Sequence, residues 1–143
     1  MKFFKNNKLT YYLLLLIIIL VGGFFRFYNL NWDQGHLFHP DERNIAMAVA
    51  RINFFQQLNP QFFAYGSFPI YLYRLAGEIL DKLTHQQRWV YEWSAINLIG
   101  RYFSAFFSTF TIFLIFLLSK RLWNPLMGLL AAFFLMAKRP EPI

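Results

Sequence analysis

Three long apolar runs without a charged residue constrain this chain more than any other feature. They cover residues 9–25, 102–119 and 122–137. As helices they would be roughly 24–27 Å long, slightly below the roughly 30 Å hydrocarbon core of a bilayer. Flanking aromatic residues and the neutral stretch 93–100 can extend or anchor them. We therefore predict an all-α, polytopic membrane protein with about three transmembrane helices, the second beginning at residue 102 or near 93.

Composition supports this class of protein. Hydrophobic residues make up 57% of the chain, whereas a soluble domain has about 45–50%. Charged residues make up 15%, whereas about 25% is usual. There is no cysteine, which excludes disulfide bonds, thiolate metal sites and cysteine nucleophiles. A cleaved signal peptide is the alternative for the first run. After Val21 the chain reads GGFFRFYNLNW, without a small-x-small cleavage site, so we expect an uncleaved span.

The basic residues predict an orientation. Five of them lie in segments without an acid, before the first run and between the second and third: Lys2, Lys5, Lys8, Lys120 and Arg121. Such segments mark the cytoplasmic side. We expect an integral protein of the cell membrane with residues 1–8 inside, residues 26–101 outside and a polar tail at 138–143. Because orientation accounts for the net charge of +7, we expect no nucleic-acid partner.

The outer segment carries two amphipathic patterns. Residues 41–58 and 69–83 each repeat apolar residues at spacings of three and four, which is typical of helices with one apolar face. Breakers separate them, including Pro60 and Gly66. We predict two helices lying in the membrane interface.

A short motif, His39-Pro40-Asp41-Glu42, begins the first of these helices. Proline and acidic residues are favoured in a first helical turn, so one interpretation is that the two acids only stabilise the helix. The functional interpretation is a general base held near the membrane surface. His36 and His39 add a third possibility, a divalent-metal site made of histidine and carboxylate ligands.

The order of four segments resembles the start of the GT-C superfamily of membrane glycosyltransferases, of the protein O-mannosyltransferase and aminoarabinose lipid A transferase type. These segments are FRFYNLNW, HPDERNIAMAVA, YGSFPIYLYRLAGEIL and the stretch from IGRYFSAFF to residue 137. The resemblance implies transfer of a sugar from a polyprenyl-phosphate donor to an acceptor on the outer face. Asp41 then matches the catalytic base, and Glu42 is the neighbouring acid of the motif.

The leaving phosphate requires a cation. The candidates are Arg43, Arg74 and Arg101, each of which also fits a snorkelling interfacial charge. Tyr65 and Tyr71 are candidates for stacking on sugar or prenyl groups, or they belong to the aromatic belt of the interface.

The family has many more spans than three, so we expect the amino-terminal part of such an enzyme, inactive without its remainder. The alternative is a small non-catalytic membrane subunit that binds a partner. A transporter fragment would place ionisable residues inside the spans, and the three runs contain none.

Overall fold

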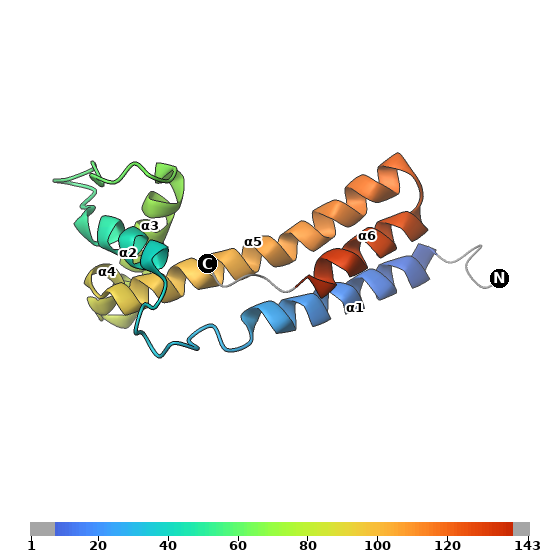
Figure 1. Cartoon of the computed structure of the whole chain (residues 1–143), viewed down its shortest axis with the longest axis horizontal. Coiled ribbons are helices and arrows are strands. Elements are labelled where there is room, and N and C mark those ends of the chain that lie inside the picture. The colour runs from blue at the N-terminus through green and yellow to red at the C-terminus, as the bar shows by residue number, and fades with distance from the viewer. Residues whose placement is uncertain (1–7, 139–143) are drawn as a thin grey trace. The chain divides into compact units, whose positions relative to one another are not determined.

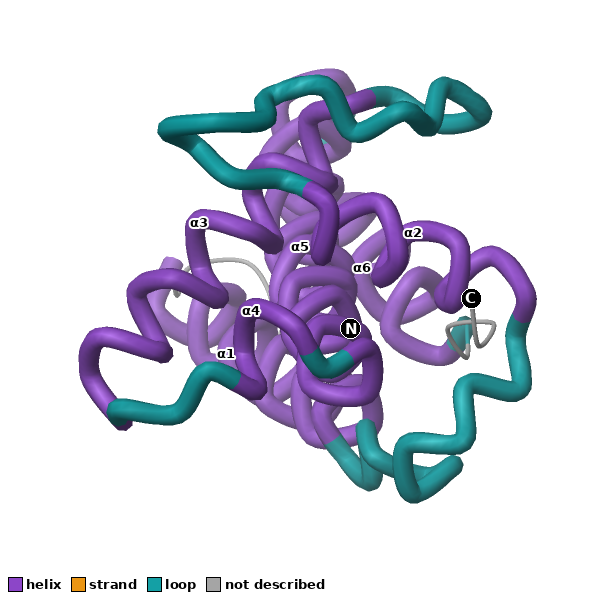
Figure 2. Tube along the Cα trace, turned by 90° about the vertical axis from the view of Figure 1, so that its left-hand side faces the viewer, coloured by secondary structure: helices purple, strands orange, loops and turns teal. Residues whose placement is uncertain are grey.

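The structure is a computed structural model that describes residues 8–138. Within this range the chain forms six α-helices and no β-strand: α1 (Lys8–Phe27), α2 (Pro40–Arg51), α3 (Ser67–Thr84), α4 (Arg88–Tyr91), α5 (Trp93–Leu122) and α6 (Pro125–Ala137). Figures 1 and 2 show these helices and the loops that join them. The predicted basic start, except Lys8, and the predicted polar tail beyond Lys138 lie outside the described residues.

Two of these helices are long and apolar enough to cross a membrane. They are α1, with 20 residues, and α5, with 30 residues. They contain the predicted runs 9–25 and 102–119, and α5 begins at Trp93, the earlier of its two predicted starts. By length and composition, the chain is therefore a candidate membrane protein with two spanning helices.

The third predicted span, residues 122–137, is not present as a full-length helix. Only Pro125–Ala137 is helical, which is 13 residues or about 20 Å. The side chain of Asn124 accepts a hydrogen bond from the Met127 amide, and Pro125 occupies the first turn. This cap starts a new helix three residues into the predicted run, so α6 is too short to cross a bilayer alone.

The chain divides into two compact units. The first is built from residues up to Tyr28 and from Ser104 onward, and the second from Asn29–Phe103. In the first unit α1 packs along α6 (Figure 1). Its buried core consists of Leu15, Ile112, Phe116, Leu129 and Ala132.

Arg26 is a buried cation of the first unit, at 5% exposure. Its guanidinium donates to the Ser108 hydroxyl (2.7 Å), the Gly22 carbonyl (3.0 Å) and the Leu135 carbonyl (2.9 Å). The sequence interpretation placed Arg26 in the outer segment. The structure instead places it in the last turn of α1, where it connects α1, α5 and α6.

The second unit contains α2, α3, α4 and the first turns of α5. Its core is formed by six buried side chains: Ala46, Ala48, Val49, Ile52, Ile70 and Ile96. Four of these side chains come from α2 and the residue that follows it. The apolar face of α2 is therefore occupied by protein, contrary to the predicted position of this face in the membrane interface.

The helix boundaries differ from the predicted ones at α2. This helix ends at Arg51, because Ile52 is already extended (φ −69°, ψ 133°), whereas the prediction ran to residue 58. Asn53 and Gln57 instead close a turn as an isolated β-bridge. Helix α3 covers the predicted range 69–83 and ends where His85 adopts the left-handed conformation (φ 54°).

Candidate functional site

The His-Pro-Asp-Glu motif starts α2. His39 is the N-cap, with extended backbone (φ −87°, ψ 123°) and no side-chain cap, and Pro40 occupies the first turn. Asp41 and Glu42 follow in the same turn. Because successive residues on a helix point about 100° apart, the two carboxylates face different surroundings. Sequence alone left open which of them is the candidate base.

Glu42 is buried, at 8% exposure, and its carboxylate is fully engaged. Both of its oxygens accept from Arg101 (3.0 and 2.7 Å), and Oε2 also accepts from the Asn97 amide (2.9 Å). A bidentate guanidinium holds the carboxylate that it binds in a fixed geometry. Glu42 therefore acts as a structural anchor of α2 on α5.

Arg101 also binds a second acid, Asp33, which is 3% exposed. Its two terminal nitrogens donate to the Asp33 oxygens at 2.9 and 2.7 Å, and one also donates to the Leu30 carbonyl at 2.8 Å. Together with the two bonds to Glu42, Arg101 makes five hydrogen bonds, as many as it has N–H groups. The hydrogen bonds from Arg101 hold the pKa of Asp33 below its usual value.

Asp41 has the opposite environment. Its side chain is 44% exposed, and its Oδ2 lies 4.0 Å from Nδ1 of His39. That nitrogen is buried and has no hydrogen-bond partner. A hydrogen bond to the Asp41 carboxylate raises the pKa of Tyr65, so the Tyr65 hydroxyl keeps its proton and donates it. Asp41 is thus an accessible carboxylate with a phenol and an imidazole beside it.

The remaining predicted cations differ in exposure. Arg74 is 3% exposed and donates to Glu78 (3.0 Å) and to the Val90 carbonyl (3.4 Å). Arg74 and Arg101 therefore stabilise the second unit, and their predicted role as phosphate ligands is not needed to explain them. Arg43, next to the motif, is exposed and stays a candidate for that role.

Aromatic side chains lie near the charged network. Arg101 Cζ is 5.5 Å from the centre of the Trp32 ring, and Trp32 stacks on Phe38 at 6.0 Å. His36 packs on the same Phe38 at 5.7 Å. Among residues 8–138, no group of three or more histidine, cysteine, aspartate or glutamate side chains could hold a metal ion. The hydroxyl of Tyr71 donates to the Leu58 carbonyl at 2.9 Å.

Sequence reasoning did not identify Asp33, Asn97 or Trp32. Asp33 and Arg101 are 68 positions apart, and Asn97 and Glu42 are 55 apart, so no local pattern joins them. The one available signal was Asn97 itself, a polar residue inside the neutral stretch 93–100.

Comparison of the chain with protein-family models, with curated proteins and with solved structures finds no match. Function must accordingly be inferred from the residues of this chain.

Proposed function

We propose that this chain is the amino-terminal part of a membrane glycosyltransferase of the GT-C type, with Asp41 as its general base. The observation that carries the proposal is the contrast within one motif. Glu42 is buried and bound by Arg101, whereas the side chain of Asp41 is 44% exposed and lies beside His39 and Tyr65. An accessible carboxylate that accepts hydrogen bonds is suited to remove a proton from a hydroxyl.

The reaction is an inverting displacement. Asp41 takes the proton of the acceptor hydroxyl while that oxygen forms a bond to the anomeric carbon of the sugar. The bond from this carbon to the phosphate oxygen breaks, and polyprenyl phosphate leaves with the electron pair. Since a phosphate is a good leaving group, the site needs a cation near it rather than a strong acid. Arg43, exposed and two residues from Asp41, is the proposed cation.

Two apolar helices that can cross a membrane support a membrane location of this reaction. A donor with a prenyl tail keeps its reactive carbon at the level of the headgroups, so a base for this carbon belongs at the end of a span. Unit two follows α1 directly. The family encloses its site with further helices, so we expect activity only where these are present.

The test compares Asp41→Asn with Glu42→Gln in membranes of the cells that naturally make the protein. In these membranes the further helices that complete the enzyme are present. Transfer from a radiolabelled polyprenyl-phosphate sugar and the thermal midpoint of the extracted protein are both measured. Asp41→Asn should lower transfer by about 10²- to 10⁴-fold and leave the midpoint unchanged. Glu42→Gln should lower the midpoint. Full transfer by Asp41→Asn would exclude Asp41 as the base.

The alternative is a non-catalytic membrane subunit that binds a partner through unit two. The exposed side chains of Phe55 (93%) and Phe63 (76%) favour it, because large aromatic groups of this kind are common in interfaces. Under this alternative Asp41→Asn leaves partner binding intact, whereas Phe55→Ser and Phe63→Ser weaken it.

A further inference from the structure

Helix α3 is apolar on two opposite sides. One side, with Ile70 and Gly77, is buried in unit two. At 100° per residue, a second apolar row lies on the opposite side of the helix. It consists of Phe68, Leu72, Leu75, Ile79 and Leu83, of which four are 71%, 50%, 50% and 74% exposed (Phe68, Leu75, Ile79 and Leu83). We call this row the outer stripe of α3.

The outer stripe contains no charged residue over its whole length. It extends from Phe68 to Leu83, about 22 Å along the helix. Glu78 and Lys82 lie beside it on one flank. A soluble helix needs one apolar face to pack against its own core. Since α3 already buries such a face, the outer stripe requires a second apolar partner.

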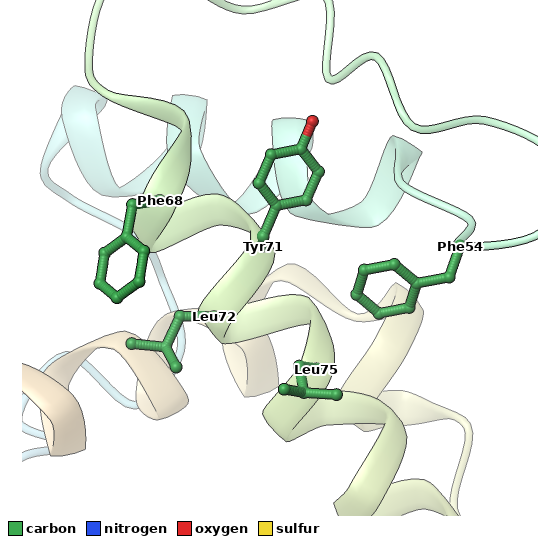
Figure 3. A pocket seen from close by; sticks show the side chains of 5 residues that line it. All are labelled: Phe54, Phe68, Tyr71, Leu72 and Leu75. Atoms are coloured by element: carbon green, nitrogen blue, oxygen red, sulfur yellow. The ribbon is translucent and has the colours of Figure 1, made fainter.

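A shallow groove along the stripe shows the chemistry of this partner. Its walls are Phe54, Phe68, Tyr71, Leu72 and Leu75, and its volume is about 330 Å³ (Figure 3). The polar atom among these side chains, the hydroxyl of Tyr71, is bonded to the Leu58 carbonyl. A groove that presents only carbon fits a hydrocarbon chain and offers nothing to a polar ligand.

We propose that the outer stripe docks into the lipid bilayer, with α3 lying along its outer interface and an acyl chain of a lipid in the groove. The connectivity of the chain singles out lipid as the occupant. Unit two begins at Asn29, two residues after α1 ends, and α5 continues from unit two into residues 104–122. Both helices are long and apolar enough to cross a membrane, so the bilayer is within reach of α3 from both ends of the unit.

Docking of α3 has a consequence for the motif. Helix α2 packs on α3, and α2 carries Asp41 in its first turn. A helix fixed in the interface therefore fixes the depth of this carboxylate relative to the headgroups. The docking itself does not depend on glycosyl transfer, since it follows from the exposed stripe.

The chain has no cysteine, so single cysteines can be introduced without background labelling. Leu75→Cys, Ile79→Cys and Leu83→Cys sample the stripe, and Lys82→Cys, at an exposed position on the flank of the same helix, is the matched control. Each variant of the full chain is labelled with a nitroxide, reconstituted in phosphatidylcholine and phosphatidylglycerol nanodiscs, and checked for native helix content by circular dichroism. Relaxation by oxygen, which partitions into lipid, is compared with relaxation by a water-soluble nickel chelate.

We expect the three stripe positions to show high accessibility to oxygen and low accessibility to nickel, and the flank position Lys82 to show the reverse. Equal accessibility to nickel on the stripe and on the flank would place the stripe in water and overturn the proposal. Low accessibility of the stripe to both reagents would show that protein covers it, either a second copy or a partner, and would overturn it as well. A transferase assay is not needed for any of these readings.

Discussion

Replacing Arg101 by methionine should destabilise unit two by about 3–5 kcal/mol. The substitution removes five hydrogen bonds and leaves two carboxylates without a counter-charge, Asp33 at 3% and Glu42 at 8% exposure. Breaking a buried ion pair from one side typically costs this much, because the remaining charge stays desolvated. For a unit of this size, 3 kcal/mol corresponds to a fall in the thermal midpoint of at least about 12 °C.

The assay is thermal unfolding in detergent, followed by tryptophan fluorescence. Arg121→Met, an exposed arginine on the same helix, is the matched control and should cost less than about 0.5 kcal/mol. The triple variant Arg101→Met, Asp33→Asn, Glu42→Gln should regain much of the loss, since it buries no charge. A loss below about 1 kcal/mol for Arg101→Met, or a triple variant no more stable than the single one, would refute the assigned role of the network.

Two further predictions concern unit two. Gly77→Ala should lower the stability of unit two by about 1–3 kcal/mol, because the added Cβ would clash with the Trp89 carbonyl oxygen. Gly66→Ala is the control and should be nearly neutral, because no atom lies within 4 Å of the added Cβ. Equal thermal midpoints for the two variants would contradict this prediction. Since Arg101 lowers the folded-state pKa of Asp33, its stabilisation should be complete above the unfolded pKa of about 3.9 and be lost as the pH falls through the lowered folded value. As the pH falls, the thermal midpoint should therefore drop more steeply for the native chain than for Asp33→Asn. The same pH dependence of the midpoint in both proteins would contradict the stabilising role of the Asp33 carboxylate.

The positions of most helices were predictable, because runs of uncharged residues and the spacing of apolar residues are local properties of the sequence. Long uncharged runs predicted the helices that became α1 and α5, and the spacing of apolar residues predicted α3 almost to its ends. The break before α6 was also visible in the sequence, as the pair Asn124-Pro125. Counting uncharged residues overlooked this pair, although a side-chain cap followed by proline is a common helix start.

The surroundings of α2 and of Arg26 could not be predicted, because they depend on contacts between segments that are distant in the sequence. The apolar face of α2 was read as membrane-facing, but the pattern cannot distinguish a lipid partner from a protein core, and α2 packs on protein. The predicted first span ended before Arg26 because a charge ends an apolar run. In the structure Arg26 belongs to α1, and carbonyls of two helices and a hydroxyl of a third satisfy its guanidinium.

The sequence also predicted a third span, which the structure does not confirm. By itself, the sequence determined that the chain is helical, that the runs within α1 and α5 are long enough to cross a membrane and that two acids begin a helix. Periodicity and charge are local, so they were sufficient for these conclusions. Only the tertiary structure separated the acids, because the partners of Glu42 lie 55 and 59 positions away on α5. Burial and pairing fix Glu42 as an anchor and leave Asp41 accessible, and this difference arises from how distant segments pack.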